Sequence, residues 1–193
     1  MRKLILGIIV SLLSVTGFGF ADTYRSGPVH TQLIFKFHHS GIAYTYGRFN
    51  EMVAVVEYNA DDIASSSIQL EVATDSIDVG VGVADMLDEE LAGPDFFNAA
   101  QFPSMTFVSS SVAENDDGTL AVTGDLTLLG VSKEMTVTVE KTGEGESFEG
   151  DKLIGFHSEF EIDRTDFGMD NLLPASGGSI IHIIFTFEGT LTE

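Results

Sequence analysis

Apolar and polar residues alternate in stretches along the chain, and this alternation predicts β-strands. Short clusters of Gly, Asp, Asn and Ser separate the stretches and are typical of turns. In Ser66–Thr74, for example, Ile68, Leu70 and Val72 share one face of a strand and polar residues share the other. The eight predicted strands are Thr31–Phe37, Tyr44–Tyr58 (bent near Gly47), Ser66–Thr74, Met105–Val112, Thr119–Leu128, Lys133–Thr142, Leu153–Ile162 and Ile180–Leu191.

One stretch departs from this alternation and predicts a helix. Within Val83–Ala92 the apolar residues recur at helical spacing, and a Gly-Pro pair then ends the pattern. A further helical turn is expected over Asp95–Pro103. Turn-forming runs at Glu114–Gly118 and Gly143–Ser147 link neighbouring strands as hairpins. The pattern therefore predicts one all-β domain with a helical insertion between the third and fourth strands.

An even number of antiparallel strands is typical of a closed barrel or a sandwich. Eight strands close into a barrel just wide enough to be filled by side chains or to hold one small ligand. Three runs, Met52–Val56, Leu126–Leu129 and Ile180–Ile184, are apolar on both faces, which indicates a second packed surface under the helical insertion. We predict an eight-stranded antiparallel barrel, with a sandwich as the alternative.

The first 21 residues are typical of a secretory signal peptide. A basic start precedes an almost uninterrupted apolar run from Leu4 to Val15, and a small-x-small sequence ends at Ala21. The run is shorter than the roughly 20 residues that a membrane-spanning helix needs. We expect cleavage after Ala21, a mature domain of residues 22–193 without stable membrane insertion, and a periplasmic or secreted location; an uncleaved anchor is the alternative.

The charge composition excludes nucleic acid as a partner. The chain has 30 Asp and Glu against 9 Lys and Arg, a formal net charge of −21. Nucleic-acid binding needs a basic surface, which this composition does not offer. The chain has no Cys and no Trp but 15 Phe, so disulfides and thiolate chemistry are absent and the apolar residues are rich in aromatic rings.

No arrangement of residues in the sequence predicts catalysis, a cofactor or a metal site. His38 and His39 are adjacent, so on a strand they point to opposite faces, and His30, His157 and His182 lack the spacing of metal ligands. A nucleophile elbow and a phosphate-binding glycine loop are also missing from the sequence. We therefore expect no enzyme activity.

Several short strings follow one another in a characteristic order across residues 24–190. They are Phe37–Gly41, Gly47–Asn50, Ser76–Gly80, Pro94–Asn98, Gln101–Pro103, Val122–Val131 and Asp163–Met169. In this order they resemble the YceI-like lipid- and polyisoprenoid-binding family of exported bacterial proteins. The chain departs from the family pattern at Ala54, where Gly is usual, at Val131–Glu134, which lacks Pro, and at Phe148, where Trp is frequent.

The resemblance implies a lipocalin-like barrel whose interior holds a long isoprenoid chain. We expect an exported binding protein that carries or sequesters a polyisoprenoid lipid, an isoprenoid quinone included. A non-catalytic stress or interaction protein with a filled barrel is one alternative, and an enzyme acting on isoprenoid lipids is another. The sequence leaves the oligomeric state open, a homodimer included.

Strand phase predicts which side chains line the interior. The expected ligand-binding residues are Leu33, Phe35, Phe37, Phe49, Val56, Leu70, Phe107, Leu126, Val137, Phe156, Phe160 and Phe185. Contacts at the mouth or to a head group are expected from Tyr44, Tyr46, Asn50, Arg48 and Arg164. Of these, Arg164 is expected above all to form an ion pair or a hydrogen-bond hub with Asp163 or Asp166.

Overall fold

The computed structural model describes residues 21–80, 84–174 and 177–192. The predicted signal peptide, apart from Ala21, lies outside these residues. The strands are β1 (Asp22–Ser26), β2 (Gln32–His39), β3 (Ala43–Phe49), β4 (Met52–Tyr58), β5 (Ser67–Ala73), β6 (Ile77–Asp78), β7 (Ser104–Glu114), β8 (Leu120–Leu128), β9 (Val131–Glu146), β10 (Lys152–Asp163) and β11 (Ile180–Leu191). The helices are α1 (Ala84–Ala92) and three 3₁₀ turns, Ile63–Ser65, Thr74–Ser76 and Arg164–Phe167.

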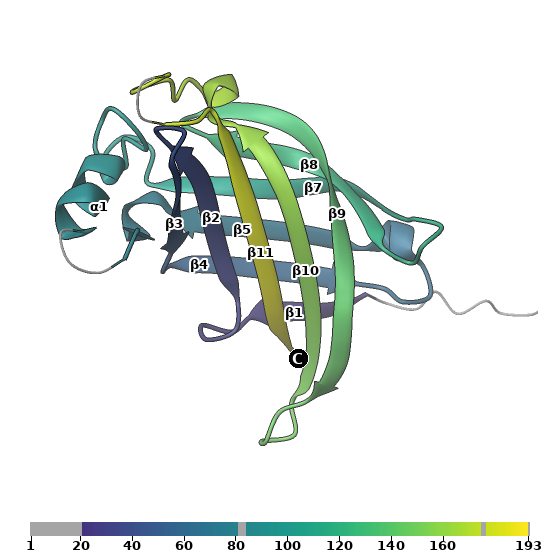
Figure 1. Ribbon diagram of the computed structural model, residues 1–193. Coiled ribbons are helices and arrows are strands. Elements are labelled where there is room, and N and C mark those ends of the chain that lie inside the picture. Colours follow the sequence, from purple (N-terminus) through teal and green to yellow (C-terminus); the bar gives the residue numbers. More distant parts are fainter. Residues whose placement is uncertain (1–20, 81–83, 175–176, 193) are drawn as a thin grey trace, which may run out of the picture.

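These strands form a closed antiparallel barrel with eight strand positions (Figure 1). Three positions are each shared by two shorter strands: β1 with β2, β3 with β4, and β5 with β6. The long last strand, β11, closes the ring, because one half of it pairs with β1 and the other half with β2. The predicted eight-stranded antiparallel barrel is confirmed, and the sandwich alternative is wrong.

The predicted strand Tyr44–Tyr58 is in fact two strands. The chain leaves β3 at Phe49 and enters β4 at Met52, so the break falls at Asn50 and not at the predicted bend near Gly47. At the break the backbone N–H of Asn50 donates to the carbonyl oxygen of Ser76, at 3.0 Å. The prediction was wrong here because this turn is held by a contact that is remote in sequence. Strands β1 and β6 were not predicted either, since each is short and is paired mostly with distant segments.

Helix α1 lies between β6 and β7 and packs against β6 and the 3₁₀ turn before it, at one end of the barrel (Figure 1). The residues after it form hydrogen-bonded turns and no regular helix, with the Phe97 N–H donating to the Leu91 carbonyl oxygen at 2.9 Å. Leu91 and Phe96 are buried against the barrel, whereas Met86 is exposed. No helix among the described residues is long and apolar enough to cross a membrane.

Candidate functional site

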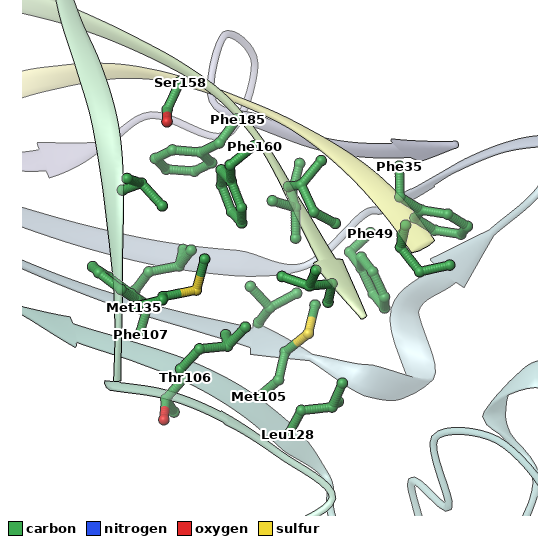
Figure 2. Close-up of a pocket in the computed structure, with 18 of the residues that line it drawn as sticks. Phe35, Phe49, Met105, Thr106, Phe107, Leu128, Met135, Ser158, Phe160 and Phe185 are labelled. Carbon is green, nitrogen blue, oxygen red and sulfur yellow. The ribbon is translucent and has the colours of Figure 1, made fainter. Parts of the chain in front are cut away.

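The interior of the barrel is hollow. A cavity of about 530 Å³ occupies the bore, and its wall is almost entirely apolar. Figure 2 shows Phe160 and Phe185 pointing into it from β10 and β11, and Met135 from the neighbouring strand β9. This volume lies in the range of about 300 to 1,000 Å³ that is typical of small-molecule sites.

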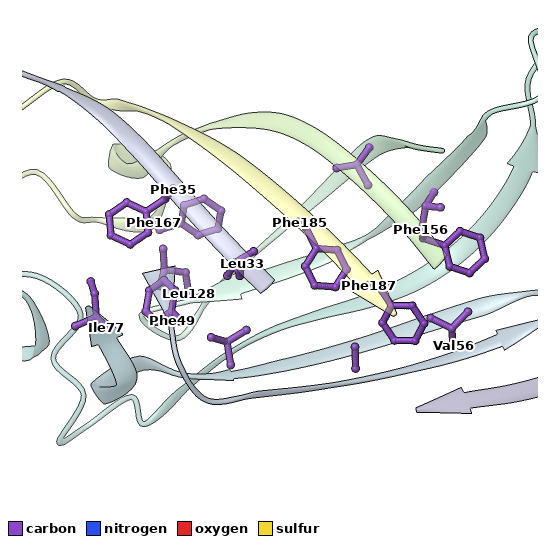
Figure 3. Close-up of a cluster of buried hydrophobic side chains, with 14 of the residues drawn as sticks. Leu33, Phe35, Phe49, Val56, Ile77, Leu128, Phe156, Phe167, Phe185 and Phe187 are labelled. Atoms are coloured by element: carbon purple, nitrogen blue, oxygen red, sulfur yellow. The ribbon is translucent and has the colours of Figure 1, made fainter. Parts of the chain in front are cut away.

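All twelve side chains predicted to line the interior border this cavity. Period-two alternation explains the result, because in β10 the side chains of Ile154, Phe156 and Ser158 are buried while their neighbours are more exposed. Two groups of rings lie toward opposite ends of the bore, with Phe185 between them (Figure 3). Phe35 and Phe49 lie 5.7 Å apart between ring centroids at one end, and Phe156 and Phe187 lie 6.2 Å apart at the other. Contact of these residues with a ligand stays a prediction.

Glycines in the wall make room for three of the inward-facing rings. The pairs are Phe35 with Gly47, Phe107 with Gly124, and Phe187 with Gly189. A Cβ atom built on Gly124 would lie 2.8 Å from Cζ of Phe107, and one built on Gly47 would overlap the Phe35 ring. The missing side chains therefore let the rings lie back against the wall, which helps to keep the centre of the bore open.

The hydrogen-bonded ladder between β9 and β10 ends partway along the barrel. Its last register pair is His157 with Glu140. At this point the buried Ser158 hydroxyl donates to the carbonyl oxygen of Thr138, at 2.7 Å, in place of a further ladder bond. Beyond it, residues 131–139 of β9 pair only with β8, and residues 158–163 of β10 pair only with β11. We call the interval between these two edges the seam.

Arg164 anchors the loop that follows β10. Its side chain is only 5% exposed and borders the cavity. Its Nε, Nη1 and Nη2 atoms donate to the backbone carbonyl oxygens of Gly178, Met169 and Asn171 at 2.9 to 3.1 Å. Burial lowers the pKa of the guanidinium, and the charges of Asp170 and Asp163 partly oppose this shift.

The predicted hydrogen-bond hub at Arg164 is therefore present, but its partners are not the predicted ones. Asp163 instead accepts from the backbone N–H and the hydroxyl of Thr165, at 3.0 and 2.7 Å. Among the described residues, no ion pair joins Arg164 to Asp163 or Asp166. The reason is geometric, because the 3₁₀ turn directs the guanidinium inward beneath the loop, where backbone carbonyl oxygens surround it.

The other four residues expected at the mouth do not border the cavity. Tyr44, Tyr46 and Arg48 occupy the outward phase of β3, and the inward positions belong to Thr45, Gly47 and Phe49. Asn50 is exposed at the break between β3 and β4. Strand alternation thus turns the three β3 residues away from the bore, and Asn50 lies in the turn that follows the strand.

Asp78 forms hydrogen bonds with two of these residues, Arg48 and Asn50, on the outer surface. It accepts from Nη2 of Arg48 at 2.9 Å and from Nδ2 of Asn50 at 3.1 Å. The hydrogen bond from Asn50, then that from the Gly80 N–H, and then that from Arg48 hold the pKa of the Asp78 carboxyl below its usual value. The cluster fixes the β3–β6 pairing and lies outside the cavity.

The twelve predicted lining residues leave out part of the wall. Leu91, Phe96 and Phe97, from the helical insertion, border one end of the cavity. Phe187 and Met135 also border it, and their phase relative to Phe185 and Val137 would have identified them. Among the described residues, no group of three or more His, Asp or Glu could hold a metal ion.

Comparison with known proteins yields consistent matches. A family model described as a YceI-like domain matches residues 24–188. A UPF0312 protein of Shewanella denitrificans is 32% identical over 188 residues, which cover 95% of this chain and 97% of that protein.

Solved structures share the fold. The structure of BcnA from Burkholderia cenocepacia matches with a TM-score of 0.74 at 24% identity, over 84% of this chain and 98% of that one. A polyisoprenoid binding domain from Saccharophagus degradans matches with a TM-score of 0.67 at 12% identity, over 89% of this chain and 99% of that domain. At such identities the likeness shows the fold alone.

Proposed function

Because this chain belongs to the YceI family, we propose that it is an exported, non-catalytic protein that holds one isoprenoid lipid in its barrel. The observation that carries the proposal is the hollow bore, whose wall is apolar along its length. The name of the polyisoprenoid binding domain with the same fold points to the same ligand class. The proposed ligand class includes a quinone with an isoprenoid tail, because the tail is a hydrocarbon chain of the same kind.

The energetics suit a ligand made of hydrocarbon. An apolar chain offers no polar groups to bind, so its affinity must come from burial, at about 0.8 kcal/mol for each methylene. Ten buried methylenes contribute about 8 kcal/mol before the cost of ordering the chain is subtracted. Phenylalanine rings and aliphatic side chains supply the complementary surface on β2, β10 and β11.

A binding role is favoured over catalysis by the state of two polar groups on the wall, those of Ser158 and Arg164. The Ser158 hydroxyl is engaged by the Thr138 carbonyl, and three carbonyls engage the Arg164 guanidinium. A serine nucleophile requires an adjacent general base, and the Ser158 hydroxyl donates to a backbone carbonyl. The basic and apolar start of the chain supports the proposal of export, to the periplasm or outside the cell.

The test is native mass spectrometry of protein produced in bacteria, followed by solvent extraction of whatever remains bound. We expect wild-type protein to retain a prenyl lipid and Phe156→Asp to lose it, because an ionised carboxylate in the bore opposes an apolar chain. Val53→Asp is the matched control, since Val53 is 42% exposed and faces outward on β4. A folded Phe156→Asp protein that carries lipid at the wild-type level would overturn the assignment.

A fluorescence measurement avoids dependence on co-purified lipid. The chain has no Trp, so Phe185→Trp introduces a single reporter into the wall. Addition of a prenyl alcohol should shift its emission to shorter wavelength as water leaves the bore. If neither retained lipid nor an emission shift is observed, the alternative of a filled barrel with an interaction role is favoured.

A further inference from the structure

The seam between β9 and β10 is an interruption in the wall of the cavity itself. Val137 of β9 and Phe160 of β10 border the cavity from its two edges, and so do Met135 and Ile162. Three of these side chains are only partly buried, although they belong to the inward phase of their strands. At the seam, therefore, the cavity wall consists of side chains that are partly exposed to solvent.

The edges of the seam carry backbone groups that no strand pairs. In an intact ladder the register after His157 and Glu140 would place Glu161 opposite Thr136. Among the residues described on these edges, no backbone hydrogen bond crosses from 131–139 to 158–163. The N–H and C=O groups along these edges can therefore form hydrogen bonds with a polar group that lies in the seam. Ser158 satisfies only the first of the freed carbonyls, that of Thr138.

The charges around the seam are mainly negative. Residues 131–139 and 158–163 contain four carboxylates, Glu134, Glu159, Glu161 and Asp163, and one cation, Lys133. An anionic group in the seam would be repelled, whereas a neutral hydroxyl or carbonyl would find donors and acceptors and meet no net repulsion. Arg164 keeps its positive charge while it donates to three backbone carbonyls, so four carboxylates here face two cations and the balance stays negative.

We propose that the seam is the site for the polar end of the ligand, and that this end is uncharged: an alcohol or a quinone carbonyl and not a phosphate. The apolar chain lies in the bore, and the head group leaves it sideways between β9 and β10. This inference rests on the proposed function and specifies which members of the isoprenoid class the protein takes.

The first experiment compares head groups on one chain. Binding of geranylgeraniol, geranylgeranyl monophosphate and the matching prenyl hydrocarbon is measured with the Phe185→Trp reporter. We expect the alcohol to bind at least about tenfold more tightly than the phosphate, which corresponds to about 1.4 kcal/mol. Equal or tighter binding of the phosphate overturns the proposal. If none of the three binds, the proposed function fails as well.

The second experiment closes the seam. The chain has no cysteines, so Thr136→Cys with Glu161→Cys can be bridged across the seam by a short bis-maleimide. The matched control is Thr123→Cys with Thr136→Cys, which bridges an intact β8–β9 pair whose hydroxyl oxygens lie 2.7 Å apart.

Bridging the seam should weaken binding of the alcohol about tenfold, while bridging the control pair should change it less than about twofold. An unchanged affinity after bridging the seam overturns the proposal. So does an equal loss in both proteins, since the modification at Thr136 would then be responsible. The unbridged forms of both variants report any effect of the cysteines themselves.

Discussion

Replacing Gly47 by alanine should push the Phe35 ring into the bore. The two residues face each other across the β2–β3 ladder, and a Cβ atom on Gly47 would overlap the Phe35 ring. The ring cannot move outward, because the wall lies behind it, so it must turn toward Phe49, whose ring centroid is 5.7 Å away. The added methyl group therefore both strains the core and narrows the cavity.

The cost can be estimated from the overlap. Adding a methyl group to a packed site costs about 1 to 3 kcal/mol. In a domain of this size about 1 kcal/mol lowers the melting temperature by about 2 to 4 °C, so we expect a decrease of about 2 to 12 °C. Binding of a prenyl alcohol should weaken in the same variant, because the displaced ring occupies ligand volume.

Thermal denaturation followed by circular dichroism measures the effect. Gly143→Ala is the control, because a Cβ atom built on this strand residue meets nothing within 4 Å. Adding Phe35→Leu to Gly47→Ala should recover part of the lost stability, since the smaller side chain leaves space for the methyl group. A Gly47→Ala protein that melts within 1 °C of wild type, or effects of the two substitutions that simply add, would refute the reasoning.

Further outcomes follow from other parts of the molecule. Phe187→Ala should cost about 3 to 5 kcal/mol in urea denaturation, because Phe187 is only 1% exposed; a loss below about 1 kcal/mol would contradict the packing. Asp78 has a folded-state pKa below its ordinary 3.8, so its stabilisation is complete above that pH and is lost as the pH falls through the folded value. Asp78→Asn should therefore reduce the decrease in the free energy of unfolding at acidic pH. An unchanged decrease would contradict a stabilising role for the Asp78 carboxylate. Melting temperature should rise from low salt to about 1 M NaCl, because screening relieves self-repulsion of the net charge of −21; a flat or falling profile would contradict this. Hydrogen exchange across residues 84–102 should slow when lipid is bound if this insertion gates the cavity, and unchanged protection would leave it a structural plug.

Much of the barrel could be predicted from the sequence because period-two alternation acts locally. Ile68, Leu70 and Val72 alternate with Gln69 and Glu71, which identifies both the strand and its inward face. The phase of the side chains along each strand therefore predicts much of the cavity wall without knowledge of which strands pair with each other. The same rule, applied more strictly, would have turned Tyr44 and Tyr46 outward, since they share a phase with Arg48.

Features that depend on contacts between distant residues could not be predicted. The break at Asn50 is held by Ser76, and the partners of Arg164 are backbone carbonyls that any sequence carries. The end of the β9–β10 ladder likewise leaves no local pattern, because the apolar alternation of β9 continues through Met135 and Val137 into the unpaired region.

The closure of the barrel by β11 determines the order in which the protein can fold. Tyr24 pairs with Leu191, and Leu33 pairs with Phe185, so the first strands acquire one neighbour only when the last strand is present. Contacts of such sequence separation must overcome a large loop-closure entropy and are associated with slow folding. Until residues 180–191 emerge, the sheet is an open sheet with free edges and an exposed apolar face, which is prone to aggregation. Truncation near the carboxyl end would thus prevent closure of the whole barrel, although it removes only one strand.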